Sequence, residues 1–297
     1  MLKAASNPTA MKNGEITDPL FRKAVEAIDS GDITTLRQLI EKHPYLVTDR
    51  LAFPEEGYFK DPYLLWFVAD NPIRNGKLAV NIADVTAYLI EQVQLFAVET
   101  TQQQLDYALG LVATGRIPRE SGAQLKMMDL LIDAGAQPGS GLGALAHGNL
   151  EAARHLVKRG GKLTLAAAVI LDMRADVDRL WPSSGPDEQL TALTAAAFYG
   201  KAPMISFLLG KGADTNGYPQ TSSGFHSHAT PLHQAVSSGS LECVQLLVKA
   251  GAGLDVKDKI YGGTPLGWAE YGQTGDVPDD QKRNFAAIAE YLASQSQ

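Results

Sequence analysis

The chain has 297 residues, of which 45% are hydrophobic and 20% charged, so it can bury a core and is not disordered throughout. A net charge of −7, with no lysine- and arginine-rich stripe, argues against nucleic acid as a partner. Cys243 is the only cysteine, no apolar stretch approaches the roughly 18 residues of a membrane span, and the polar N-terminus lacks an export signal. We therefore expect a monomeric, cytoplasmic protein that does not enter a membrane.

Helix pairs with irregular insertions are predicted along the first half of the chain, after a loose polar tail of residues 1–17. The first pair has Gly31 at its turn, and the next two are each split by an insertion. In chain order, these pairs cover residues 21–44, 63–71 with 82–92, and 105–115 with 125–137.

A loop at residues 50–62 separates the first two predicted pairs. It carries three aromatic residues, Phe53, Tyr58 and Phe59. Stacking of helix pairs does not require aromatic side chains in a loop, so this segment is either a lid that folds back over the helices or a contact for a partner.

Two less regular units follow. Residues 142–161 form a shortened helix pair with Gly148 at the turn, and residues 162–187 have helical periodicity without clear start and stop residues. The second segment is acidic, but it has no calcium-binding loop pattern, so its carboxylates are expected on a solvated helix face. These carboxylates are Asp172, Asp176, Asp178 and Glu188.

The clearest internal repetition lies in the last third, at residues 189–216, 229–255 and 262–293. In the second of these units, Thr230 is placed to cap a helix with its hydroxyl, and Pro231 takes the first helical position, where no amide donor is lost. Gly239 and Gly251 then end the two helices of the pair. In the last unit, the polar stretch QTGDVPDD is expected to loop out between the helices, and the pair to close the array as a cap.

The sequence TPLHQA from Thr230, followed at about one period by TPLGWA from Thr264, resembles the TPLHxA signature of the ankyrin repeat, whose period is about 33 residues. The chain is thus identified as a member of the ankyrin-repeat family, similar to the stand-alone bacterial type. This resemblance implies an all-α solenoid of about eight helix pairs with finger-loop insertions. A single array is expected over residues 18–297.

The resemblance also implies a non-catalytic scaffold that binds another, unidentified protein through its concave face and finger loops. No cofactor is expected, and the common hydrolase, nucleotide and zinc-protease motifs are absent from the sequence. Aromatic residues gather in the last two finger loops and the helix that follows, where they are either anchors for an interface or, as Trp268 and Tyr271 could be, packing that seals the terminal repeat. The predicted contacts for a partner are Tyr218, Phe225, His226, His228, Tyr261 and Trp268.

An alternative role for the same region is a metal or small-molecule site. His226 and His228 alternate along the chain and could share one face of an extended segment, with Asp258 or Glu270 supplying a carboxylate. His233 is expected instead to hydrogen-bond within its own turn, and Cys243 to be a buried, inert thiol. The residues therefore favour protein binding, with no metal ligand assigned.

Overall fold

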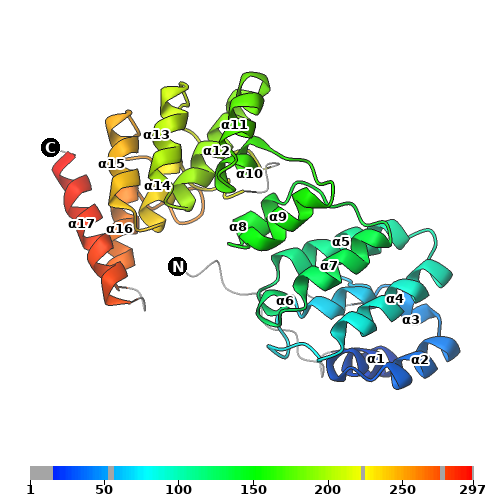
Figure 1. The fold of residues 1–297 in the computed structure, drawn as a ribbon. Helices are drawn as coiled ribbons and strands as arrows, with labels where there is room; N and C mark the ends of the chain where they lie inside the picture. The colour runs from blue at the N-terminus through cyan, green and yellow to red at the C-terminus, as the bar shows by residue number, and fades with distance from the viewer. Residues whose placement is uncertain (1–15, 53–56, 222–224, 275–277, 296–297) are drawn as a thin grey trace. The chain divides into compact units, whose positions relative to one another are not determined.

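The computed structural model describes residues 16–52, 57–221, 225–274 and 278–295. Within these ranges the secondary structure is helical and contains no β-strand, which confirms the predicted all-α class. The described chain divides into two compact units, one up to residue 162 and the other from residue 163 onward (Figure 1).

The N-terminal unit consists of two rows of helices. The first row comprises α1 (Pro19–Ser30), η2 (Leu64–Ala69), α5 (Thr101–Thr114) and α8 (Leu142–Ala146), each packed against the next. The second row comprises α2 (Ile33–Lys42), α4 (Ile82–Phe96), α7 (Gln124–Asp133) and α9 (Leu150–Lys158), again in successive contact. Two short helices, α3 (Tyr45–Thr48) and α6 (Arg116–Glu120), lie in the connections.

The C-terminal unit repeats this arrangement with more regular helices. Its first row comprises α10 (Leu165–Ile170), α12 (Pro186–Phe198), α14 (Pro231–Ser237) and α16 (Pro265–Thr274), packed one against the next. The helices paired with them are α11 (Arg174–Leu180), which continues into η3 (Trp181–Ser183), α13 (Ala202–Gly210), α15 (Leu241–Lys249) and α17 (Asp279–Gln295).

Capping residues set several of the helix boundaries, and among them Gly31 and Thr230 lie where the sequence predicts. Asp18 accepts hydrogen bonds from the backbone N–H groups of Leu20 and Phe21 at 2.8 and 3.1 Å, which satisfies two of the free donors at the start of α1. Gly31 ends α1 in the left-handed conformation with a φ of 75°, a conformation that glycine adopts without the steric cost of a side chain. The same combination recurs at α14, which Thr230 caps and Gly239 follows, and at α15, which Ser240 caps and Gly251 follows.

Some boundaries differ from the sequence-based expectation. The second pair begins with a short 3₁₀ helix, η2, which Asp70 ends in the left-handed conformation. In the last pair, α16 runs through Thr274 and α17 starts at Asp279, so both ends of the predicted polar loop are helical.

The start of the fold also differs from the predicted tail. Residues 1–15 of that tail lie outside the described residues. Ile16 is buried, and the Arg22 guanidinium donates two hydrogen bonds to its carbonyl oxygen, at 2.9 and 2.5 Å. Packing therefore begins within the segment that was predicted to be loose.

Candidate functional site

The start of α14 is held by a reciprocal cap between Thr230 and His233. The Thr230 hydroxyl lies 2.7 Å from His233 Nδ1, and His233 Nε2 lies 3.0 Å from the carbonyl oxygen of Gly263. Because a carbonyl oxygen only accepts, we assign the ring proton to Nε2, which leaves Nδ1 as the acceptor. Burial lowers the pKa of His233, in keeping with a neutral ring. The histidine thus bonds within its own turn and reaches the next loop.

Residues 251–264 form the last finger loop. The Asp258 carboxylate accepts several hydrogen bonds from the backbone of this loop. One carboxylate oxygen accepts from the backbone N–H groups of Ile260 and Tyr261, at 2.9 and 2.6 Å. The other accepts from Gly263 N–H at 2.8 Å and from the indole N–H of Trp268 at 3.0 Å. Burial alone would raise the pKa of Asp258, but these donors hold it below its ordinary value. The carboxylate therefore fixes the turn.

The preceding finger loop, described at residues 211–221 and 225–230, is bonded to the last one. The hydroxyl of Tyr218 donates to the carbonyl oxygen of Lys257 at 2.6 Å, and the Lys259 ammonium lies 4.1 Å from the centroid of the Tyr218 ring. The amide of Asn216 donates to Gly251 O at 3.1 Å and accepts from Gly253 N–H at 2.9 Å. The two loops form one connected surface within the C-terminal unit.

A series of rings runs along the base of these loops. Phe225 packs edge-on against Phe198 with 5.7 Å between centroids, and His226 stacks on the same ring at 4.5 Å. His228 lies 6.0 Å from His226 and 6.2 Å from the ring of Trp268. Burial lowers the pKa of His228, while the charge of Asp258 acts in the opposite direction. These rings anchor the loops to α12 and α16.

The predicted contact residues fall into two groups by exposure. Tyr261 is 63% exposed, and Tyr218, His226 and His228 are partly exposed. Phe225 is only 1% exposed and Trp268 8%, because both belong to the series of packed rings at the base of the loops. The prediction that Phe225 and Trp268 contact a partner directly is therefore at odds with their burial, and their role here is to position the loops.

The alternative metal site finds little support in this geometry. Within the described ranges, no three histidine, cysteine, aspartate or glutamate side chains are grouped so that they could hold a metal ion. Each oxygen of Asp258 already accepts two N–H donors, so this carboxylate serves the backbone turn. Cys243 is buried as expected, and burial raises the pKa of its thiol.

In the N-terminal unit, the loop at residues 50–62 contributes to the core. Phe59 is buried and packs edge-on against Phe67 at 5.2 Å. Tyr58 is more exposed; its hydroxyl donates to Asn71 Oδ1 at 2.9 Å, and its carbonyl oxygen accepts from the Tyr107 hydroxyl. Phe53 lies outside the described residues. The described part of this loop is thus closer to the predicted lid than to a free contact surface.

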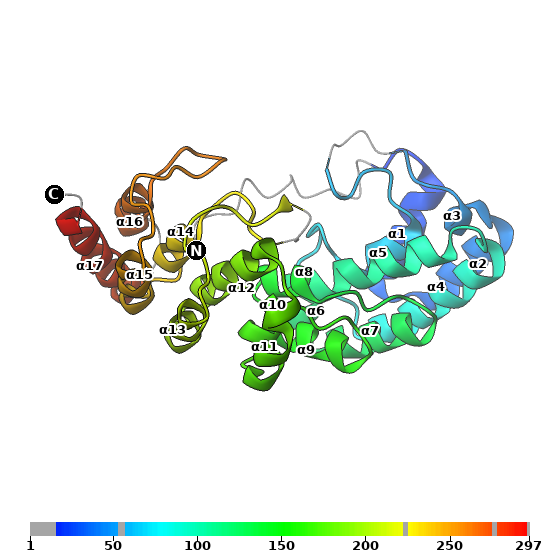
Figure 2. The ribbon, with the colours of Figure 1, turned by 90° about the horizontal axis from the view of Figure 1, so that it is seen from above.

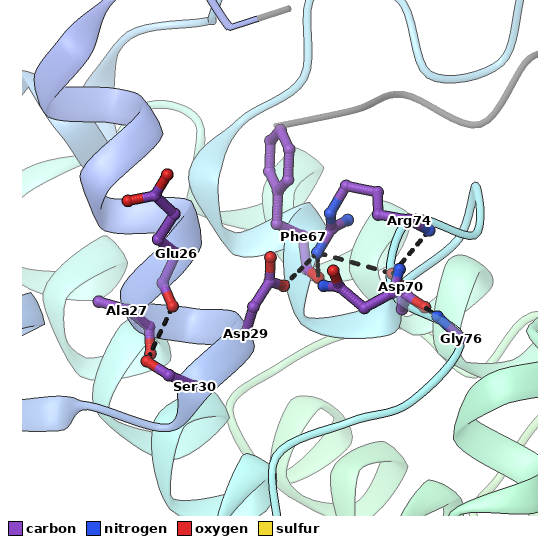
Figure 3. A network of polar contacts seen from close by, with 9 residues as sticks. Glu26, Ala27, Asp29, Ser30, Phe67, Asp70, Arg74 and Gly76 are labelled. Atoms are coloured by element: carbon purple, nitrogen blue, oxygen red, sulfur yellow. Dashed lines mark hydrogen bonds and ion pairs between the residues drawn. The ribbon is translucent and has the colours of Figure 1, made fainter. Parts of the chain in front are cut away.

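A buried ion network secures the same unit (Figure 3). The Arg74 side chain is 1% exposed and donates through Nη2 to Asp29 Oδ1 at 2.7 Å and to the Phe67 carbonyl oxygen at 3.0 Å. Asp70, 3.8 Å from the same nitrogen, accepts the backbone N–H groups of Arg74 and Gly76, each at 2.9 Å. The network joins α1 to the loop after η2.

Sequence reasoning missed the roles of Asn216 and of the Arg74 network. Asn216 ends the segment GADTN, where a polar side chain after a stop glycine was a usable signal. Arg74 lies in an insertion, and its partner Asp29 is 45 positions away in sequence, so no local pattern connects them. The sequence suggests Asp258 only as a metal ligand, although an aspartate whose side chain accepts from the backbone N–H two residues later is typical of turns.

Two rows of successive helices with loops bonded between neighbours define a helical-repeat protein. Residues 120–260 match the family model described as ankyrin repeats (3 copies), so this part of the chain consists of ankyrin repeats. Repeats of this family are generally protein-interaction modules. The assignment of ankyrin repeats outside residues 120–260, their exact number and the bacterial stand-alone type stay predictions.

The chain is also similar to individual proteins. It is 26% identical over 147 residues to the transient receptor potential cation channel subfamily A member 1 of Drosophila melanogaster, a match that covers 48% of this chain and 11% of that protein. Among solved structures, the human ASB11 ankyrin repeat domain matches at 19% identity and a TM-score of 0.33, covering 68% of this chain and 96% of that one. None of the described helices is long and apolar enough to cross a membrane.

Proposed function

We propose that the protein is a non-catalytic scaffold that binds another protein through the finger loops of its C-terminal unit. The observation that carries this proposal is the exposure of large apolar side chains on a turn that is already rigidly bonded: Ile260 is 56% and Tyr261 63% exposed. Their backbone N–H groups are fixed by Asp258. A soluble partner that covers such side chains gains apolar burial without having to order the loop.

The proposal is tested by affinity capture from the native lysate with matched variants. Tyr261→Ala removes the exposed ring of the last finger loop, and Tyr271→Ala removes an equally exposed ring on α16, which serves as the control. We expect a partner captured by the wild type and by Tyr271→Ala to be reduced with Tyr261→Ala. If all three proteins capture the same partners in the same amounts, the finger-loop site is wrong.

A further inference from the structure

The tip of the last finger loop, residues 257–261, combines two cations with two exposed apolar side chains. Lys257, Lys259, Ile260 and Tyr261 are all exposed, whereas Asp258 between them is buried. The loop projects away from the helices of its unit (Figure 2). The side chains that a partner meets at the tip are therefore basic and apolar, although the whole chain carries a net charge of −7.

Neither lysine of the tip forms an ion pair with a described residue. Among the described residues, neither Lys257 nor Lys259 has a carboxylate oxygen within 4.0 Å, while Lys201 and Lys211 in the same unit pair with Asp172 and Asp178. The ammonium of Lys259 is placed by the Tyr218 ring, which leaves its charge unneutralised. Asp255 is the only exposed carboxylate of the last finger loop.

The turn that presents these groups is preorganised. Asp258 N–H donates to Gly263 O at 2.8 Å, Gly262 N–H donates to Asp258 O at 3.2 Å, and Lys259 N–H donates to the His228 carbonyl oxygen at 2.8 Å. With the backbone fixed at several points, binding orders only the side chains of the tip. This lowers the entropic cost of binding and favours a small contact that a short peptide segment can fill.

We propose that the tip of the last finger loop recognises an acidic protein segment that carries an aromatic or aliphatic residue. The carboxylates of the segment pair with Lys257 and Lys259, and its apolar side chain packs on Ile260 and Tyr261. This inference rests on the proposed protein-binding function and specifies the chemistry of the partner. Charge complementarity of this kind sets the choice of partner and the association rate, while the apolar anchor supplies most of the affinity.

The test uses a random twelve-residue peptide library displayed on phage and selected on the full chain. The finger-tip variant is Lys257→Glu with Lys259→Glu. The control is Lys249→Glu with Arg283→Glu, which alters two exposed cations elsewhere in the unit and gives the same net charge. We expect the wild type and the control to enrich acidic peptides with an apolar residue, and the finger-tip variant to bind those peptides at least about tenfold more weakly. Because all four positions are partly or fully exposed, thermal melting is expected to be similar for the three proteins.

The outcomes separate this inference from the function on which it rests. Enriched peptides that are neutral or basic, or that bind the finger-tip variant as tightly as the control, overturn the acidic-segment inference but leave protein binding in place. If no peptide is enriched on any of the three proteins while all three melt cooperatively, both this inference and the proposed finger-loop function fail.

Discussion

The two units solve the same problem, joining successive helix pairs through their loops, by different chemistry. In the N-terminal unit a buried guanidinium, Arg74, and a group of aromatic rings hold an irregular insertion in place. In the C-terminal unit, Asp258 bonds the backbone of its own finger loop, and Asn216 bonds the backbone of the neighbouring one. The finger loops of the C-terminal unit are held by hydrogen bonds to their backbone, which leaves the side chains at their tips exposed. The described part of the loop at residues 50–62 packs its rings into the core and so exposes less of its surface.

The largest expected effect is a loss of stability in the N-terminal unit when Arg74 is replaced. Arg74→Ala leaves the carboxylates of Asp29 and Asp70 without their buried cation, and removing one partner of a buried ion pair costs about 3–5 kcal/mol. Hydrogen exchange should therefore accelerate in α1 and η2 and remain unchanged in α12 and α14. The control is Arg37→Ala, whose guanidinium lies over the Tyr88 ring. Faster exchange spread equally over both units would contradict a local role for Arg74.

A smaller loss is expected from the corresponding change in the C-terminal unit. Asp258→Asn places an NH₂ group where an oxygen now accepts two N–H donors, and each buried donor left without an acceptor costs about 1–3 kcal/mol. The backbone N–H of Gly263 and the indole N–H of Trp268 should lose protection from hydrogen exchange. Asp255→Asn, an exposed position in the same loop, should leave them protected. Equal effects of the two substitutions would show that the carboxylate of Asp258 is not what holds the turn.

Mild acid should weaken the C-terminal unit through His228 and His233. His228 and His233 have pKa values lowered by burial from the ordinary 6.5, so the folded state favours their neutral forms. Their contribution to stability is complete above pH 6.5 and is lost as the pH falls from there through the lower folded-state values. The contribution of Asp258, whose pKa is lowered, disappears only below its ordinary 3.8.

The measurement is the melting temperature at pH 7.5 and pH 5.5, with hydrogen exchange to locate the change. We expect a decrease confined to the C-terminal unit, and a smaller decrease in His233→Gln, which cannot gain a proton. A melting temperature that is the same at both pH values in the wild type would refute this assignment.

The smallest effect tests the irregular repeat that opens the C-terminal unit. Asp172 occupies the turn between α10 and α11 with a φ of 59°, where Gly200 occupies the next turn with a φ of 62°. Asp172→Gly relieves this strain at the loss of an exposed ion pair with Lys201, so we expect a gain in stability of up to about 1 kcal/mol. Gly200→Ala makes the opposite change, because it places a side chain in the left-handed conformation, and should lower the free energy of unfolding by about 1 kcal/mol. Urea denaturation measures both, and a loss in each variant would contradict the strain argument.

The sequence predicted much of this fold because its signals are local. The helix α14 starts at Pro231 with Thr230 as its cap, as the sequence predicts. His233 bonds within its own turn, as expected. The exposure of the candidate site was less predictable. Phe225 and Tyr261 are both aromatic residues in finger loops, yet one is buried against Phe198 and the other is exposed. That difference depends on how an insertion folds over a neighbouring helix, which no periodicity in either segment encodes.

His233 links the stability of successive repeats. Its Nδ1 completes the helix start of its own pair, and its Nε2 binds the carbonyl oxygen of Gly263 at the entry to the next. Loosening of the last finger loop thus removes a partner from the cap of α14, and loosening of that cap frees the loop. The final repeats of the chain should consequently unfold as one cooperative block, without fraying inward from the C-terminus one helix pair at a time.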